Sequence, residues 1–477
     1  MPKGSLEIEV NAEELQQTVI RNGFCIGCGA CAVTAGSPFT IKHDRYGRLQ
    51  AKLEGNDQSQ VPFDEICPFG AKAPDEDTVA DIFLGESPQR HAAVGRFRTC
   101  HIGHVKDTLT RGRASSGGIG RWLAAEMLRQ DLVDAVVHVT PDTSAQSPLH
   151  LFRFSVTQQP EELEQSARSA YYPVSLDRVL DHIRQRPGRY VITGVPCFIK
   201  AMRLLSLHDP IIRERIVFTI GIICGHLKSS AFAEAFGWQL GVPPEDLAGI
   251  EFRGKLASAP ANHKGVSAKS RSESTWTAMH SSKTLLGGDW GLGLFKYKAC
   301  DYCDDVTAET ADVAIGDAWL PEFVNDSQGT SVIICRNRAI ESLLKKGQDN
   351  GALNLLDSTP EQIARSQAGG LRHRREGLAY RLARDEALGR WHPPKRVAPS
   401  DTRLTGRRKK IYELRSALAE YSHEAFLQAK EVGDFSVFIR MMQPLINRYE
   451  RAQVPWHKLL RKRAKAFLKK NAGTSES

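Results

Sequence analysis

The fold is decided by two adjoining runs of sequence, Phe-Lys-Tyr-Lys-Ala-Cys-Asp-Tyr-Cys-Asp-Asp (295–305) and Ala-Asp-Val-Ala-Ile-Gly-Asp-Ala-Trp (311–319). Cys300 and Cys303 form a C-x-x-C pair, a spacing at which two thiolates can bind one metal centre. The apolar residues at 313–315 predict a strand that leads into Gly316 and Asp317. A cluster or a zinc ion needs four ligands, so this pair is half of a site.

Cys197 and Cys224 are the best-placed candidates for the other two ligands. Each follows an apolar run typical of a buried strand, at 190–195 and at 217–223. Because strand ends of an α/β sheet converge on one edge, we predict that four cysteines from three strand exits meet at one point. A cofactor would lie beside them.

A second cysteine set lies near the N-terminus, where Cys25, Cys28 and Cys31 form C-x-x-C-x-x-C and Cys67 is followed by proline. This is the ligand pattern of a ferredoxin-type 4Fe-4S cluster, in which glycines allow tight turns and proline stiffens the last ligand. We predict one cluster here. Zinc is the alternative, but structural zinc usually takes two separated C-x-x-C pairs.

The run Arg-Gly-Arg-Ala-Ser-Ser-Gly-Gly-Ile-Gly (111–120) precedes a helical pattern. A helix start of this kind offers backbone N–H groups, hydroxyls and nearby arginines to an anion, and would suit the phosphate or ring of a flavin. The alternative is a capped helix after a glycine turn. The run lacks the spacing of a Rossmann fingerprint or a P-loop. The candidate cofactor-binding residues are Arg113, Ser115, Ser116, Gly117, Gly118 and, at the end of its strand, Asp317.

Strand and helix patterns alternate from residue 132 to residue 240, which predicts an α/β protein with a mainly parallel sheet. At 477 residues the chain is too long for one core. We predict a ferredoxin-like 4Fe-4S segment (1–90), a catalytic domain (91–336) and a helical, basic C-terminal region (337–477). The segment at 257–273 is rich in Ser, Ala, Lys and Gly and predicts a mobile surface loop.

The net charge of +9 belongs to the C-terminal tail, because residues 395–477 carry 19 Lys and Arg against 8 Asp and Glu. Within the tail, apolar residues from Trp456 to Leu468 recur at helical spacing between cations. Three interpretations stay open: a helix packed on the protein itself, one lying on an anionic membrane surface, or one docking on an acidic protein. Nucleic acid is not expected, since one aromatic residue makes no stacking platform.

The chain shows no N-terminal signal pattern and no apolar run long enough to span a membrane. We therefore expect a cytoplasmic protein, which the tail would place against the inner membrane face if it binds lipid. Ten cysteines, several in C-x-x-C form, indicate metal or cluster binding in a reducing compartment. Cys100 and Cys335 fall outside both ligand sets and are expected to be packed thiols.

Taken together, these motifs resemble the coenzyme F420 hydrogenase/dehydrogenase beta-subunit family of iron–sulfur flavoproteins. The matching runs are the N-terminal cysteine segment, Arg-Ala-Ser-Ser-Gly-Gly (113–118), Thr-Gly-Val-Pro-Cys (193–197), Cys-Gly-His-Leu-Lys (224–228) and Cys-Asp-Tyr-Cys-Asp-Asp (300–305) with Gly316-Asp317. The resemblance implies FAD on the α/β domain, a 4Fe-4S cluster beside it, and exchange of electrons with a two-electron substrate.

The resemblance leaves the substrate open. Similar proteins act on a deazaflavin coenzyme or on chlorophyll-type tetrapyrroles, or lie in polysaccharide-related settings, and the form at 224–228 and the long tail resemble the last group most. A flavin converts single electrons from clusters into hydride equivalents for an organic substrate, and a proton donor is then needed. The candidates are His226, Lys228 and Asp305, with a structural role as the alternative for each.

Two classes of function follow from this reading. In the first, the protein is an oxidoreductase whose own flavin site binds an organic substrate and whose electron donor or acceptor is ferredoxin or another carrier. In the second, it is an electron-transfer subunit that feeds a partner enzyme. A zinc protein without catalytic activity is a third possibility only if the cysteines bind no iron. A substrate-sized cavity beside the flavin would favour the first class.

Overall fold

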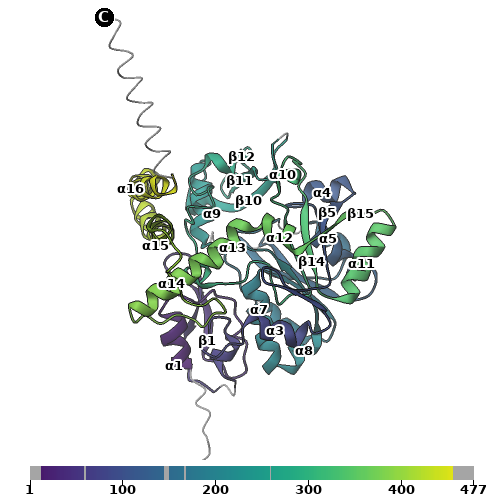
Figure 1. Ribbon diagram of the computed structural model, residues 1–477. Coiled ribbons are helices and arrows are strands. Elements are labelled where there is room, and N and C mark those ends of the chain that lie inside the picture. Colours follow the sequence, from purple (N-terminus) through teal and green to yellow (C-terminus); the bar gives the residue numbers. More distant parts are fainter. Residues whose placement is uncertain (1–11, 59–60, 144–149, 166–167, 258, 455–477) are drawn as a thin grey trace, which may run out of the picture.

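The protein is described by a computed structural model over residues 12–58, 61–143, 150–165, 168–257 and 259–454 (Figure 1). Its centre is an eight-stranded sheet with helices on both faces. In spatial order the strands are β15 (Leu353–Ser358), β5 (Thr99–Val105), β14 (Ser331–Cys335), β13 (Val313–Asp317), β9 (Ile216–Ile222), β8 (Tyr190–Gly194), β6 (Ala135–Pro141) and β7 (Phe152–Thr157).

Four consecutive strands of this sheet, β13, β9, β8 and β6, run parallel to one another. The strands on either side of this group join it by antiparallel pairing. The α/β class and the parallel centre agree with the sequence pattern. Each predicted strand between 132 and 335 has its counterpart in the sheet.

Successive residues of the central strands face opposite sides of the sheet, so two cores form. Val136 and Val191 pack with helices α5 (Ile119–Arg129) and α11 (Arg338–Asp349) on one side. Val137 and the following strands pack on the other side against α6 (Asp177–Gln185) and α7 (Pro196–His208). Pro196 opens α7, where its missing N–H costs no helical hydrogen bond.

The N-terminal segment packs on the α7 side of the sheet and shares its core (Figure 1). It contains a two-stranded hairpin and short helices, and Phe39 and Phe63 meet edge to face with ring centroids 5.0 Å apart. Its elements are α1 (Ala12–Leu15), a π-helical turn (Gln16–Ile20), β1 (Phe39–His43), β2 (Leu49–Leu53), α2 (Phe63–Ile66) and α3 (Glu76–Phe83).

A second sheet contains β10 (Leu247–Lys255), β11 (Lys264–Ser270) and β12 (His280–Ser281), and packs against α9 (Ser230–Gln239). The prediction of a mobile loop at 257–273 was wrong for residues 264–270, because β11 is a largely buried strand. Its small residues allow close packing, and Val266 and Ala268 face the core. The lysine and serine content concealed this alternation.

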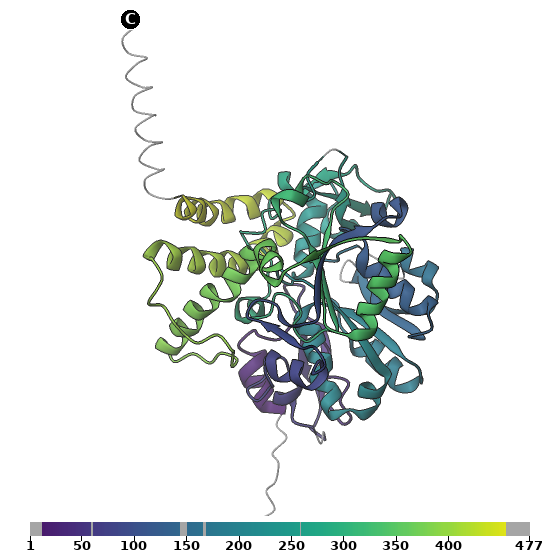
Figure 2. The same cartoon turned by 45° about the vertical axis from the view of Figure 1, so that its right-hand side comes forward.

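The chain beyond residue 337 is mostly helical but also contributes the edge strand β15. Figure 2 shows the last two helices side by side at one flank of the molecule, packed as a hairpin over α9. The helices after α11 are α12 (Pro360–Ser366), α13 (Ala368–Arg374), α14 (Glu376–Ala387), α15 (Gly406–Val432) and α16 (Phe435–Gln453). The apolar stripe predicted from Trp456 onward lies outside the described residues.

Within the described part of the chain, no helix has the length and apolar character needed to cross a bilayer.

Candidate cofactor site

The four cysteines predicted as the inner ligand set line one narrow cavity together. Cys197 lies at the start of α7, directly after β8, and Cys224 follows β9. Cys300 lies instead in a short 3-10 helix (Lys298–Tyr302) that precedes β13, and Cys303 directly follows this helix. The prediction of three strand exits was therefore wrong in one respect, since only two of the four cysteines follow strands.

The cavity brings together four thiols and a backbone donor, which can support a metal cluster. Burial raises the pKa of all four thiols, to about 12 for Cys224 and about 11 for Cys303. Thiolates in such a place need bound cations, and iron would provide them. The backbone N–H of Leu227 already donates to Cys300 Sγ over 3.1 Å, a contact that stabilises a cluster ligand.

Arg374, at the end of α13, closes this cavity and was not anticipated from the sequence. Its side chain is buried and donates to the carbonyl oxygens of Gly225 (2.6 Å), Asp305 (2.9 Å) and Cys224 (3.3 Å). One guanidinium therefore joins the two loops that carry the ligands. Although burial opposes its charge, the four thiols raise the pKa of Arg374, so it stays cationic beside them.

The N-terminal cysteines also lie together. Burial raises the pKa of Cys25, Cys28, Cys31 and Cys67, and neighbouring cysteines of the same set raise the last three further. Ala51 N–H donates to Cys25 Sγ over 3.3 Å. The two sets are adjacent, because Cys28 contributes to the raised pKa of Cys197 and because Ile26 and Phe69 line the inner cavity.

Among the described residues, no group of three or more His, Cys, Asp or Glu is arranged to hold a single metal ion. A 4Fe-4S cluster differs from a single-ion site in that each thiolate binds its own iron atom.

A large cavity of about 950 Å³ adjoins the inner cysteines. It lies between the main sheet, the second sheet and the C-terminal helices, and Cys224, Leu227 and Arg374 line both cavities. Six of the predicted cofactor-binding and catalytic residues line it: Ser115, Ser116, Gly118, His226, Lys228 and Asp317. Arg113, Gly117 and Asp305 are not among its lining residues.

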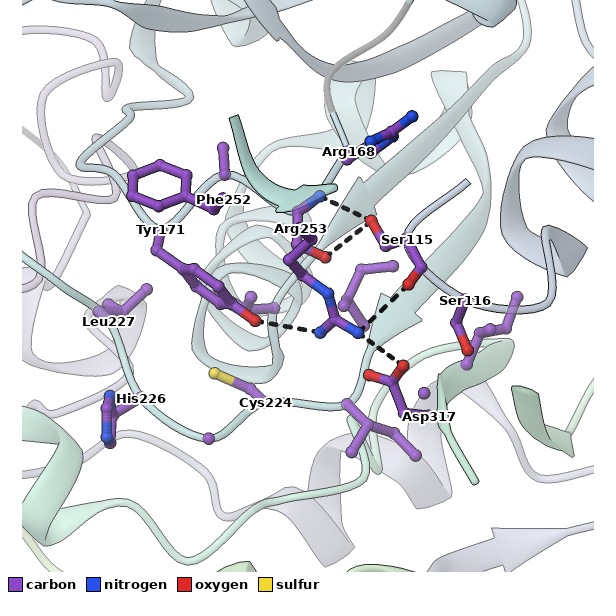
Figure 3. A pocket seen from close by; sticks show the side chains of 18 of the residues that line it. Ser115, Ser116, Arg168, Tyr171, Cys224, His226, Leu227, Phe252, Arg253 and Asp317 are labelled. Carbon is purple, nitrogen blue, oxygen red and sulfur yellow. Dashed lines mark hydrogen bonds and ion pairs between the residues drawn. The ribbon is translucent and has the colours of Figure 1, made fainter. Parts of the chain in front are cut away.

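Arg253, from β10, lies at the middle of this cavity and was also missed from the sequence (Figure 3). Its guanidinium donates to Asp317 Oδ1 (2.6 Å), to the hydroxyl of Tyr171 (3.0 Å) and to the carbonyl of Ser115 (3.4 Å). The second sheet is thereby linked to the 111–120 run and to β13. Burial alone would raise the pKa of Asp317, but Arg253 and Lys264 hold it below its usual value.

Lys264, from β11, adds a second cation at this place. Its Nζ donates to the carbonyl of Ser115 over 2.9 Å and lies 5.7 Å from the ring centroid of Trp319. Burial and then Arg253 lower the pKa of Lys264 to about 8. With Arg168, which donates to the carbonyl of Arg113, these cations line the cavity beside the glycine-rich run.

Two glycines of that run, Gly117 and Gly118, have structural roles that the sequence did not separate. Gly118 is the N-cap of α5 with φ +85°, a left-handed conformation that favours glycine. A Cβ on Gly117 would lie 2.7 Å from the carbonyl oxygen of Gly103 and 2.9 Å from Ser331 N. Close packing of the loop on β5 and β14 therefore requires Gly117, and its substitution does not report on a cofactor alone.

The three predicted proton donors differ in position. The His226 ring stacks on Trp290 with centroids 4.2 Å apart, and its Nδ1 is buried without a hydrogen-bond partner among the described residues. Lys228 Nζ donates to the carbonyl of Leu294. Asp305 accepts from Glu309 N–H over 2.9 Å and lies away from the large cavity. Of these three residues, only His226 and Lys228 can contact a ligand in the large cavity.

Comparison with known proteins supports one family. Residues 100–181 match the model described as coenzyme F420 hydrogenase/dehydrogenase, beta subunit N-term, and residues 188–361 match the corresponding C-terminus model, together more than half of the chain. The chain belongs to this family. The resemblance inferred from the motifs is thereby confirmed.

Among solved structures, a chain of the F420-reducing NiFe hydrogenase complex from Methanosarcina barkeri is similar. It is 14% identical with a TM-score of 0.48, and the match covers 64% of this chain and 98% of that one. No curated protein matches the chain. The N-terminal cysteine segment and helices α13 to α16 lie outside the residues that the family models match.

Proposed function

We propose that this protein is an iron–sulfur flavoprotein oxidoreductase that passes electrons between two 4Fe-4S clusters and FAD, and so reduces or oxidises an organic substrate. The observation that carries the proposal is the shared wall of the two cavities. Cys224 and Leu227 face both the narrow cysteine cavity and the large cavity, so a cluster in one would adjoin a flavin in the other.

The inner cluster would be held by Cys197, Cys224, Cys300 and Cys303, and the outer one by Cys25, Cys28, Cys31 and Cys67. A bound flavin would supply the exchange between single electrons and hydride equivalents. In the chain itself, Arg374 fixes the loops of the inner ligands, and Ile26 and Phe69 exclude water from the space between the two sets.

Ser115, Ser116, Arg168, Arg253 and Lys264 would bind the anionic part of FAD. Backbone groups and cations near the start of α5 favour the binding of a phosphate, and both kinds of group line that side of the cavity. Asp317 orients Arg253, and Tyr171 holds the same guanidinium from the other side. His226 and Lys228 line the cavity beyond Cys224, and His226 is best placed to exchange a proton with a substrate.

The large cavity has a volume of about 950 Å³ and aromatic and cationic walls. This favours a protein with its own substrate site over a subunit that only transfers electrons. Ferredoxin or another carrier would then exchange electrons at the outer cluster. Turnover of a substrate by the isolated chain with a chemical electron donor would exclude the electron-transfer alternative.

The test is anaerobic purification followed by iron, zinc and flavin analysis and a visible spectrum. We expect about eight irons per chain and one FAD. The Cys300→Ala/Cys303→Ala double variant should retain about four irons, while Cys100→Ala should retain all of them, since Cys100 belongs to neither set. Zinc in place of iron, or an unchanged iron content in the double variant, would overturn the assignment.

A further inference from the structure

Three basic side chains, Lys228, Lys296 and Arg415, act on the imidazole of His226 at one end of the large cavity. Lys228 and Arg415 line the cavity there. Lys228 is almost fully buried, and Arg415, from α15, is half-buried.

Asp301, the carboxylate that pairs with Lys296, is already shared among other partners. Asp301 accepts from Lys296 Nζ (2.5 Å) and from Ser416 Oγ (3.1 Å), and its Oδ1 lies 2.9 Å from His373 Nε2. Arg381 lies 4.0 Å from the same oxygen. Asp301 therefore offsets Lys296, and in the described part of the chain no acidic side chain lies within ion-pair distance of Lys228 or Arg415.

Two polar atoms at this end of the cavity have no hydrogen-bond partner among the described residues: Arg415 Nε, a donor, and His226 Nδ1. The other ring nitrogen of His226 lies 3.4 Å from the carbonyl oxygen of Trp290, which can only accept, so Nε2 carries the hydrogen and Nδ1 is an acceptor. Buried polar atoms are almost always paired in folded proteins, so these two need a partner that the described side chains do not supply.

The walls between these atoms are aromatic. Trp290 stacks on His226 with planes 12° apart, and Phe232 stacks on Phe252 at 5.7 Å. Lys228 Nζ lies 4.5 Å from the Phe232 ring centroid and 4.8 Å from that of Trp290. Rings of this kind favour a flat, conjugated ligand over a flexible aliphatic one.

We propose that this end of the cavity binds a planar organic anion, with Arg415 binding its carboxylate or phosphate, Trp290 and Phe232 packing on its ring, and His226 Nδ1 accepting from a hydroxyl or N–H group on it. The inference rests on the proposed function, because this anion would be the substrate that meets the flavin. Arg415 lies beyond residue 361, so this specificity belongs to the part of the chain that the family models do not match.

Benzoate, phenyl phosphate and benzamide are suitable probes, since the neutral amide matches benzoate in shape. We expect full-length, anaerobically purified protein to bind benzoate or phenyl phosphate at least about tenfold more tightly than benzamide in calorimetric titration. Whichever of benzoate and phenyl phosphate binds more tightly shows whether the site prefers a carboxylate or a phosphate. Arg415→Gln should reduce that ratio to near one, and Arg415→Lys should restore part of it.

The matched control is Arg407→Gln, which removes the same charge from an exposed position of α15. It should leave the ratio unchanged. Equal binding of benzoate, phenyl phosphate and benzamide to the unaltered protein would overturn the proposal, and this comparison does not depend on any variant folding. Iron and flavin are measured on the same sample: a loaded protein without anion preference refutes the anion site alone, whereas a sample without iron and flavin refutes the proposed redox function.

Discussion

Arg253 and Asp317 form a buried ion pair of 2.6 Å between two different sheets, β10 and β13. Removing one partner leaves the other charge buried and unpaired, which costs about 3–5 kcal/mol. We therefore expect Arg253→Gln to lower the free energy of unfolding by that amount in urea titrations and to lower flavin content. The Arg253→Gln/Asp317→Asn double variant should recover most of the stability, since no unpaired charge remains. Additive losses in the two single variants would contradict this account.

A pH dependence follows from His423 in α15, whose Nδ1 lies 2.9 Å from the carbonyl of Ala419. Burial, and then Arg48, lowers the pKa of His423 to about 3. The unfolded chain takes up a proton near pH 6.5 while the folded chain does not, so stability falls as the pH drops from about 6.5 towards 3. The loss from this residue is about 2 kcal/mol at pH 5.

His423→Gln keeps a side-chain donor for the Ala419 carbonyl but cannot titrate. We expect its melting temperature to fall less between pH 7 and pH 5 than that of the unaltered protein. His280→Gln, on the exposed strand β12, is the control and should keep the full slope. An identical slope in all three proteins would show that His423 is protonated in the folded state.

Lys395 acts on cysteines of both sets. Its charge lowers the pKa of Cys67 and of Cys303, against the larger effect of burial, and its Nζ lies 4.8 Å from the Phe69 ring centroid. A nearby cation stabilises the more negative, reduced form of a cluster. We expect Lys395→Gln to make both cluster potentials more negative by on the order of tens of millivolts in redox titrations followed by electron paramagnetic resonance.

Lys395→Arg should keep the original potentials. Lys72→Gln serves as the control, because Lys72 is exposed and paired with Asp64 at 3.2 Å. Equal shifts in Lys395→Gln and Lys72→Gln would indicate a general charge effect instead of a local one.

Two substitutions of Arg374 can separate its role in holding the ligand loops together from the effect of its positive charge. Arg374→Met removes both, whereas Arg374→Lys keeps the charge but cannot reach three carbonyl groups in the same way. If the guanidinium holds the ligand loops together, both variants should lose about half of the iron while flavin content changes less. If the Arg374→Lys variant has the same iron content as the unaltered protein, the charge of Arg374 alone is what retains the iron.

Local patterns predicted the central strands well, because the continuous apolar runs of β6, β8 and β9 indicate strands buried on both faces. They also grouped eight cysteines into two sets that the structure brings near each other. The spacing of cysteines in a motif reflects the short-range chain geometry on which the ligand loops depend.

The residues that sequence reasoning missed have no local signature. Arg253, Lys264, Arg374 and Arg415 come from a strand, a segment taken for a loop, and helices near the end of the chain. A single cation in an ordinary strand or helix looks like a solvated side chain, and only the tertiary contacts reveal that it is buried. Part of the segment at 257–273 was misinterpreted for the same reason, since its composition is polar while six of the seven residues of β11 are buried.

The bonds from Arg374 to the carbonyl groups of Cys224, Gly225 and Asp305 also bear on the order of events during biosynthesis. A growing polypeptide cannot form them until this arginine has emerged from the ribosome, long after all four cysteines of the narrow cavity have been translated. Until then the guanidinium cannot join the two ligand loops. On the proposed function, stable iron loading of this cavity should therefore follow the emergence of Arg374.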